Sequence, residues 1–276
     1  MPWAGAGPPT LPGVETIAEI PGLRLESDGG VAHLLLDRAE KANALTQQMW
    51  DAIPGFAAEA AASGARVLVL RSVTPKVFSA GADVAEYRAN AGSVEWGLAN
   101  HRRVSAATDA LHRCPLATVA AIAGPCAGGG VGLITACDLR IATEDAVFAV
   151  PPAKLGLIYP QADTARLVDL VGPSAAKLLL LTATRVDAAW ALRVGLLDEV
   201  APTGSLNAAV TAMTDRISAG APVSIRGMKQ TIDLVLAGQR DENDRTRELL
   251  AEALAHPDHA EGTAAFLERR PPRFGG

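Results

Sequence analysis

The sequence predicts an α/β domain with a largely parallel sheet, followed by a mainly helical C-terminal third. Up to Pro173, short apolar runs of strand length alternate with longer stretches of helical periodicity. This alternation is typical of parallel sheets whose strands are linked by helices. After Pro173 the helical pattern is almost uninterrupted. The chain is 49% hydrophobic but only 4% aromatic, which indicates a core of closely packed aliphatic side chains.

The first part of the predicted domain contains two strands and two helical stretches. VAHLLL at 31–36 is a strand candidate, and the helix expected at 46–63 has Thr46 as its N-cap. RVLVLRS at 66–72 predicts a buried strand, after which a helical stretch extends to about Leu111.

The second part repeats the pattern around a run of glycines. TVAAIAG at 118–124 predicts a strand, AGGGVGLITACD at 127–138 a glycine turn that opens a helix, and LRIAT at 139–143 a further strand. We then expect successive helices, with a soft boundary near residue 200. Their sequences are SAAKLLLLTATRVDAAWALRVGL, LNAAVTAMTDRISAG, VSIRGMKQTIDLVLAG and RDENDRTRELLAEALA.

Composition excludes several classes of protein. The net charge of −5 argues against a nucleic-acid-binding surface, although a local basic patch could still bind an anion. Cys114, Cys126 and Cys137 contain no CxxC pair, so we expect reduced, buried thiols in a cytoplasmic protein. No apolar run reaches the roughly 18 residues that span a bilayer. Residues 1–14 are rich in Pro and Gly and are expected to form a flexible leader, not a signal peptide.

The glycine turn at 127–138 offers backbone N–H groups to a polar ligand. It fits a dinucleotide fingerprint poorly, because Thr135 stands at the third glycine position and no acidic residue lies about 20 residues on. The chain has no GK[ST] P-loop, no GxSxG elbow and no HExxH motif. HPDH at 256–259 is a weak metal-ligand pair, for which a solvated turn is the preferred interpretation. No metal site is therefore expected.

A second turn of small residues, VFSAGADVAEY at 77–87, follows another predicted strand. Two such turns at neighbouring strand ends could direct two N–H groups at one oxygen. That arrangement stabilises an enolate or tetrahedral oxyanion formed from a thioester carbonyl. Either turn taken alone would be interpreted as an ordinary Gly/Ala turn.

Six segments follow one another along the chain: LDRAEKANALT (36–46), VFSAGADV (77–84), VAAIAGPCAGGGVGLITACDLRIAT (119–143), AVFAVPPAKLGL (146–157), GPSAAKLLLLTATRVDAAWALRVGLLDEV (172–200) and EGTAAFLERRPPRF (261–274). In sequence and in order they resemble the motifs of the crotonase (enoyl-CoA hydratase/isomerase) superfamily, and the resemblance covers residues 15–274. It implies an α/β fold made as a crotonase-like spiral of ββα units at 15–200 that binds acyl-CoA. It also implies a helical region at 201–276 that assembles homotrimers or dimers of trimers. The substrate would be an acyl-CoA or enoyl-CoA thioester, with no further cofactor.

The resemblance also implies the binding residues of the thioester. Ala82 and Gly129 match the two positions whose backbone N–H groups form the oxyanion hole, the second helped by the start of a helix. Ala80 and Asp83 belong to the same substrate-binding turn as Ala82. For Asp83 we prefer a structural role, as a cap or brace of that turn.

Cations are needed to hold the negatively charged CoA on an acidic protein. Lys41 lies in the stretch that the family places near the nucleotide. Arg270 and Arg273 match a C-terminal basic stretch that reaches CoA from the same or a neighbouring subunit. Each of the three could instead be a solvated surface charge.

The chain departs from the family at both hydratase glutamates. The resemblance places Gly132 at the first position and Pro152 at the second. Because neither residue can transfer a proton, ordinary two-glutamate hydration is not expected. Isomerase, hydrolase and lyase chemistry all remain open.

Three other residues could replace the missing glutamates. Tyr159 and Asp163 stand close to the expected acyl pocket, where burial would raise the pKa of a carboxylate and make it a base. Asp163 could also be the N-cap of the helix DTARLVDLVG, which we prefer. Glu86 could be an auxiliary group, although a surface position is preferred. The sequence thus favours a crotonase-fold enzyme that stabilises an enolate or oxyanion; the alternative is a non-catalytic acyl-CoA-binding protein.

Overall fold

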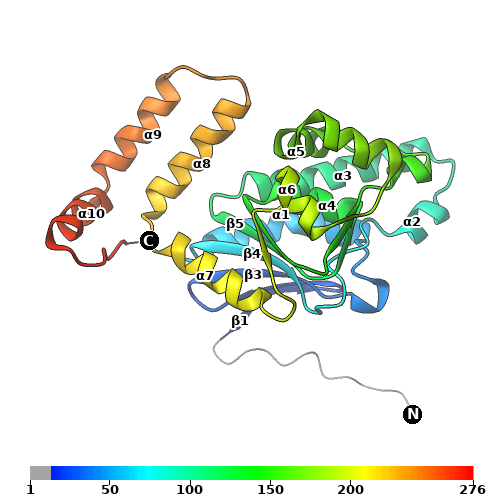
Figure 1. Cartoon of the computed structure of the whole chain (residues 1–276), viewed down its shortest axis with the longest axis horizontal. Coiled ribbons are helices and arrows are strands. Elements are labelled where there is room, and N and C mark those ends of the chain that lie inside the picture. Colours follow the sequence, from blue (N-terminus) through cyan, green and yellow to red (C-terminus); the bar gives the residue numbers. More distant parts are fainter. Residues whose placement is uncertain (1–13, 276) are drawn as a thin grey trace, which may run out of the picture.

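The computed structural model describes residues 14–275, so the leader expected at 1–14 lies outside the described residues except for Val14. A seven-stranded sheet in the order β1-β2-β3-β4-β5-β7-β10 lies at the centre, beside a smaller sheet β6-β8-β9 (Figure 1). The strands are β1 (Glu15–Ile20), β2 (Leu23–Ser27), β3 (Val31–Leu36), β4 (Val67–Ser72), β5 (Ala117–Ile122), β6 (Pro125–Ala127), β7 (Leu139–Thr143), β8 (Val147–Ala149), β9 (Val186–Asp187) and β10 (Glu199–Ala201).

The helices fall largely where the periodicity predicts them. They are η1 (Ala39–Lys41), α1 (Gln47–Ala62), α2 (Val84–Ala89), α3 (Val94–His112), α4 (Gly129–Ala136), η2 (Pro152–Leu155), α5 (Gln161–Thr182), α6 (Ala188–Val194), α7 (Leu206–Ser218), α8 (Pro222–Leu236), α9 (Asp244–Ala255) and α10 (Pro257–Glu268). The side chain of Thr46 accepts a hydrogen bond from the N–H of Met49, which confirms the predicted N-cap of α1.

The large sheet is mostly parallel, as the sequence predicts. Strands β3, β4, β5, β7 and β10 run parallel to one another, whereas at one edge β2 pairs antiparallel with both β1 and β3. The sequence analysis missed the β1–β2 hairpin. The segment ETIAEI alternates polar and apolar residues only weakly, and most of it is exposed or half-buried, so it lacks the apolar run that marks the inner strands.

The chain repeats one ββα unit three times. A strand of the large sheet is followed by a short segment in the second layer and then by a helix: β5–β6–α4 and β7–β8–α5 are complete units. β4 leads in the same way to Ser79, which pairs with Cys126 of β6, and then to α2 and α3. This is the spiral of ββα units that the resemblance implies.

Two apolar layers cover the two faces of the large sheet. The larger one packs α1, α3, α4 and α5 against the sheet and includes Trp50, Phe78 and Phe148. The smaller one lies under α7 and includes Val69 and Val119. Because residues two apart on a strand share a face, the two layers assign every side chain of β4, β5 and β7 to one side or the other.

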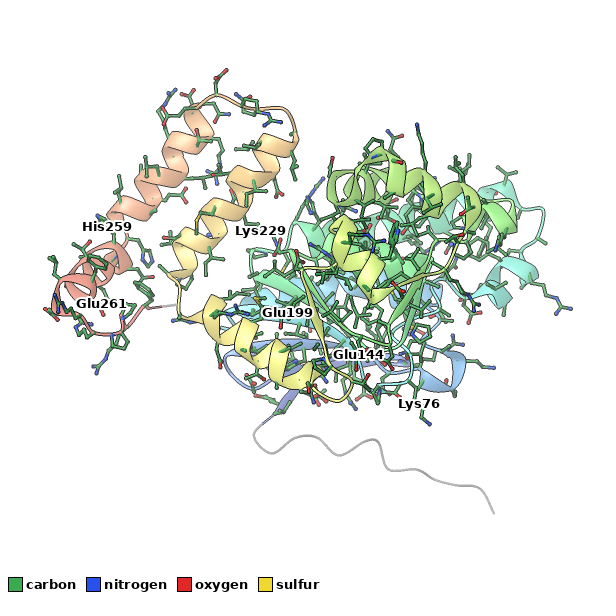
Figure 2. All side chains as sticks on the ribbon, in the orientation of Figure 1. Lys76, Glu144, Glu199, Lys229, His259 and Glu261 are labelled. Carbon is green, nitrogen blue, oxygen red and sulfur yellow. The ribbon has the colours of Figure 1, made fainter. Side chains whose placement is uncertain are left out.

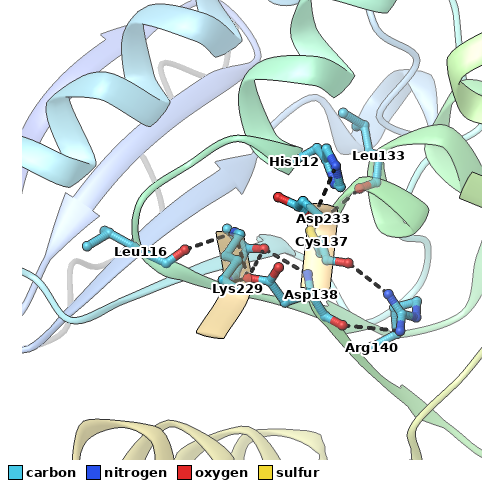
Figure 3. A network of polar contacts seen from close by, with 9 residues as sticks. His112, Leu116, Leu133, Cys137, Asp138, Arg140, Lys229 and Asp233 are labelled. Carbon is cyan, nitrogen blue, oxygen red and sulfur yellow. Dashed lines mark hydrogen bonds and ion pairs between the residues drawn. The ribbon is translucent and has the colours of Figure 1, made fainter. Parts of the chain in front are cut away.

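Helices α8 to α10 form an arm beside this body, called here the C-terminal arm (residues 222–275; Figure 1). Its first helix is anchored by Lys229, whose Nζ donates to the carbonyl of Leu116 at 3.2 Å and to Asp138 Oδ2 at 2.8 Å (Figure 3). His112 Nε2 lies 3.6 Å from Asp233 Oδ1 in the same network. Within residues 14–275, no helix combines the length and apolar character that crossing a membrane requires.

The remaining sequence expectations concern thiols and metals. All three cysteines are free and buried, as predicted. HPDH forms the junction of α9 and α10, where Nδ1 of His256 accepts the N–H of Asp258 as a helix cap. The predicted turn is confirmed, although Asp258 is buried rather than solvated. Among the described residues, no group of three or more His, Cys, Asp or Glu side chains is placed to hold a metal ion.

Candidate functional site

The first predicted turn, at 79–82, is held by a buried asparagine. The side-chain amide of Asn43 donates to Ser72 Oγ at 2.8 Å and to the carbonyl of Phe78 at 2.9 Å. In return, Ser79 Oγ donates to the carbonyl of Asn43 at 2.8 Å. These bonds fix the backbone on both sides of the turn, so that the N–H group of Ala82 has a defined direction.

The second turn, at 127–130, packs against the first, backbone to backbone. A β-carbon on Gly81 would lie 2.7 Å from the carbonyl oxygen of Ala127, and one on Gly129 would lie 2.9 Å from Trp50 Cζ2. Gly81 and Gly128 also have positive φ angles of 90° and 53°. Glycine is required here because any side chain would separate the two turns.

Among the N–H groups that the two turns leave unpaired, those of Ala82 and Gly129 lie close together. The N–H groups of Ala82 and Gly129 donate to no acceptor among residues 14–275, although the N–H of Asp83 and of Gly128 on either side are paired. The position of a β-carbon on Gly129 is 3.5 Å from the nitrogen of Ala82. Gly129 is the first residue of α4, where the helix dipole favours negative charge. The pair can therefore bind an oxygen that carries negative charge.

A carboxylate fills the space one helical turn further along α4. A β-carbon on Gly132 would lie 2.9 Å from Asp163 Oδ2 and 3.2 Å from the hydroxyl of Tyr159. Gly129 and Gly132 are three residues apart on α4, so they share a face of the helix. Asp163 and Tyr159 thus lie next to the unpaired N–H groups, although they come from a different ββα unit.

Asp163 is completely buried and only half satisfied. Its Oδ1 accepts from Arg166 Nη1 at 3.0 Å, whereas its Oδ2 has no hydrogen-bond partner among the described residues. Arg166 is shared, since it also pairs with Asp109. Burial raises the pKa of Asp163, although the nearby hydroxyl of Thr108 and the charge of Arg166 oppose the shift. A carboxylate with a raised pKa and an unpaired oxygen is suited to proton transfer.

The preferred interpretation of Asp163 as a helix N-cap is wrong. Helix α5 begins at Gln161 with Pro160 as the N-cap, and Asp163 lies inside the first turn. Its side chain points into the protein because Arg166, one turn on, holds Oδ1. The sequence DTARL resembles a capping pattern, but the N-cap is Pro160, three residues before Asp163.

Tyr159 is also buried, and its hydroxyl donates to the carbonyl oxygen of Gly128 at 3.1 Å. Burial raises the pKa of Tyr159 well above its ordinary value, so the phenol stays protonated. It therefore braces the peptide that precedes Gly129.

The remaining residues of the first turn have structural partners. Asp83 is the N-cap of α2, where it accepts the N–H of Ala85 at 2.9 Å and pairs with Arg38 at 2.7 Å, as preferred from the sequence. Ala80 is exposed, and its N–H donates to the carbonyl of Ala42. Glu86 accepts the N–H of Gln47 at the start of α1, so it is not the plain surface residue that was preferred.

The predicted cations do not gather around the turns within one chain. Lys41 is exposed at the end of η1. Arg270 is paired with Glu261 and Glu268, both at 2.6 Å, and lowers the pKa of Glu261 to about 2. Figure 2 shows Glu261 on the C-terminal arm, on the opposite side of the molecule from Lys76, which shortly precedes the first turn in the sequence. Arg273 follows on the same arm and is exposed, and its N–H donates to Glu261.

Pro152 starts η2, and it carries no group that transfers protons. The second glutamate position of the resemblance therefore has no chemistry of its own. The carboxylate that the structure places next to Gly132, one turn from Gly129, is that of Asp163.

Sequence reasoning missed three residues that hold this site in place. The first is Asn43, which the sequence shows only as one letter of a motif. The structure shows it buried, with a φ of 50° that asparagine adopts more readily than most residues. Trp50 supports Gly129 from α1, and its place in the core gave no sign of this. Arg166 could have been found, because it lies three residues after Asp163 on a predicted helix.

A spiral of ββα units with two unpaired N–H groups at adjoining glycine turns defines a crotonase-type α/β protein. The model of the enoyl-CoA hydratase/isomerase family matches residues 26–276, and the chain belongs to that family of enzymes, within the crotonase superfamily.

Relatives and solved structures agree with this assignment. A putative enoyl-CoA hydratase of Thermus thermophilus is 35% identical over 89% of this chain and 98% of its own length. A probable mitochondrial enoyl-CoA hydratase 2 of Arabidopsis thaliana is 33% identical over 91% of this chain and 83% of its own. The crystal structure of a putative enoyl-CoA hydratase/isomerase family protein from Hyphomonas neptunium is 36% identical, with a TM-score of 0.89, over 92% of this chain and 97% of that one.

Proposed function

We propose that the protein acts on an acyl-CoA thioester by moving a proton at the carbon next to the thioester carbonyl. The N–H groups of Ala82 and Gly129 bind the carbonyl oxygen, and Asp163 is the acid–base group. The observation that carries the proposal is the unpaired Oδ2 of Asp163, which is buried against Gly132 one turn from Gly129.

The reaction begins with the carboxylate form of Asp163. Oδ2 takes the proton of the α-carbon, and the electron pair of the broken C–H bond forms the C=C bond of an enolate. The negative charge moves to the former carbonyl oxygen, where the two N–H groups stabilise it. Asp163 then returns the proton to the α-carbon, or to the γ-carbon of a β,γ-unsaturated chain, which isomerises it. These steps need no cofactor beyond the CoA of the substrate.

Addition of water across a double bond fits this site less well. Hydration needs one group that activates water and another that supplies the α-proton. Gly132 and Pro152 supply neither, and the described groups next to Gly132 are one carboxylate, that of Asp163, and the phenol of Tyr159, which stays protonated. Isomerisation or a related reaction through the enolate requires only one such group.

The acyl and CoA parts of the substrate have candidate surfaces. Leu155, Leu157 and Ile158 are exposed immediately before Tyr159, and Ile158 is 92% exposed. Apolar side chains in that position suit an acyl chain. Lys41 is an exposed cation on the same polypeptide stretch as Asn43, which makes it the candidate partner for the CoA phosphates.

The C-terminal arm supports self-association as a homotrimer or a dimer of trimers. It exposes large apolar side chains on all three of its helices, among them Met228, Ile232, Leu254 and Phe266. Burying such a surface favours association of subunits. In that assembly, the arginines at 270 and 273 would approach the site of a neighbouring subunit.

The alternative is an acyl-CoA-binding protein without catalysis. It is supported by the loss of both hydratase glutamates and by the complete burial of Asp163 in the free protein. In that case the N–H pair would hold the thioester, and the carboxylate would only fill the space in front of Gly132.

A panel of saturated, 2-enoyl and 3-enoyl thioesters tests the proposal. We expect turnover of at least one thioester, and loss of that turnover in Asp163→Asn. Asp169→Asn is the matched control, because Asp169 is exposed on the same helix. Tight thioester binding without turnover of any substrate would instead support the binding protein.

A further inference from the structure

A cavity lies on the face of the large sheet opposite the paired glycine turns. It has a volume of about 250 Å³ and is lined by the ends of β4, β5 and β7 and by the start of α7. Gly129 packs against Trp50 in the apolar layer of α1, whereas this cavity adjoins the layer under α7. Ligands of open parallel sheets bind at the carboxyl ends of strands, where this cavity lies.

The register of the strands places two polar side chains in this cavity. On β4, Arg71 follows Val67 and Val69 at alternate positions, so it shares their side of the sheet. On β7, Thr143 follows Ile141 in the same way. Arg71 and Thr143 are therefore both on the side of the sheet that faces α7, next to the apolar residues that pack against that helix.

Thr143 is buried, and its hydroxyl has no hydrogen-bond partner among the described residues. The residue is 4% exposed, and its Oγ1 makes no hydrogen bond to any described residue. A buried polar group left unpaired costs about 1–3 kcal/mol, so a ligand that accepts a hydrogen bond from this hydroxyl would remove that cost. Thr143 is among the residues that line the cavity.

The start of α7 adds further donors. Its N-cap, Ser205, makes no side-chain hydrogen bond to the helix. The N–H groups of Leu206 and Asn207 donate to no acceptor among the described residues, and both residues line the cavity. Arg71 is held towards this helix end, because its Nη2 donates to Asn207 Oδ1 at 2.7 Å.

These donors all suit one kind of ligand. We propose that the cavity binds a phosphate group, held by the guanidinium of Arg71, the hydroxyl of Thr143 and the first N–H groups of α7. A cation, a hydroxyl and a helix N-terminus are complementary to a tetrahedral dianion. No aspartate or glutamate is among the described residues that line the cavity, so no carboxylate repels the ligand there.

Inorganic phosphate is the probe for this site. We expect saturable binding by calorimetry at constant ionic strength, with chloride as the balancing anion, because screening is then the same throughout. Arg71→Met should abolish the binding. Thr143→Val should weaken it about tenfold, the effect of one hydrogen bond to a charged group.

Stability separates a binding role of Thr143 from a structural one. Without phosphate, Thr143→Val should raise the melting temperature, because it removes an unpaired buried hydroxyl. The matched control is Thr214→Val, a buried threonine of α7 whose hydroxyl donates to the carbonyl of Thr211. That variant should melt lower and bind phosphate normally. Phosphate binding that is absent, or that survives both the Arg71 and Thr143 substitutions, would overturn the proposal.

CoA itself carries phosphate groups, so binding of acyl-CoA tests whether the phosphate in this cavity belongs to the substrate or to another ligand. An acyl-CoA and its analogue without the 3′-phosphate should bind Thr143→Val and the parent protein equally, because the thioester site lies across the sheet. A loss of acyl-CoA affinity in Thr143→Val that the analogue does not show would contradict a separate site.

Discussion

A β-carbon on Gly132 would lie 2.9 Å from Oδ2 of Asp163, so the carboxylate occupies the space that a side chain at position 132 would need. The resemblance places the first hydratase glutamate at that position. A glutamate there would crowd the carboxylate of Asp163, so one of the two side chains would have to move. In the proposed mechanism the acid–base group is therefore on α5 instead of α4.

A double-mutant cycle measures this crowding. Gly132→Ala should lower the free energy of unfolding by about 1–2 kcal/mol, because overpacking exceeds the gain in helix propensity. In an Asp163→Ala background, the same substitution should cost less, with a coupling of about 1 kcal/mol. Gly97→Ala is the control, because a β-carbon there meets open space. Strictly additive effects in denaturant titrations would contradict the packing described here.

The pH dependence of stability tests the burial of Asp163. The pKa of Asp163 is raised from 3.8 in the folded protein, so the folded state binds its proton more tightly than the unfolded state does. The contribution of Asp163 to the free energy of unfolding is therefore most favourable below pH 3.8, and it declines as the pH rises through the raised pKa. Asp163→Asn should increase stability relative to the parent above that range and change it less at low pH. Urea titrations across pH 3.5–8 measure this, and a constant difference would argue against a raised pKa.

Tyr159→Phe tests the brace on the peptide before Gly129. The carbonyl of Gly128 keeps two backbone donors, Val131 and Gly132, so the fold should lose only about 1 kcal/mol. We expect kcat to fall several-fold while KM changes little, because the N–H of Gly129 is less well directed. The only other tyrosine, Tyr87, provides the control: its hydroxyl accepts from Asn100, and Tyr87→Phe should lower stability alone. Equal kcat values in Tyr159→Phe and Tyr87→Phe would contradict the role of the Tyr159 hydroxyl in directing the N–H of Gly129.

Gly129→Ala tests the oxyanion position itself. Its β-carbon would lie 2.9 Å from Trp50 Cζ2 and displace the N–H group. Loss of one such donor lowers kcat by about 10²–10³-fold. Steady-state kinetics on the substrate found in the thioester panel provide the measurement. A variant that folds and retains parental kcat would show that Gly129 donates no catalytic hydrogen bond.

The sequence predicts the framework better than it predicts the site. The runs that became β3, β4 and β7 are mostly apolar and are recognisable at once, whereas the weakly patterned β1 is not. The two glycine turns were found because positive φ and close backbone contact demand glycine. That Asp163 faces Gly132 could not be predicted, since it depends on how α5 crosses α4 and on where Pro160 starts α5.

Exchange of the α-protons of a saturated acyl-CoA in D₂O, followed by mass spectrometry, tests the central claim most directly. It detects the enolate without assuming which product the enzyme makes. We expect the parent protein and Asp169→Asn to incorporate deuterium at the α-carbon. Asp163→Asn should be slower by about 10²–10⁴-fold, the usual contribution of a general base. Exchange that proceeds at the parental rate in Asp163→Asn would contradict the assignment of Asp163 as the base.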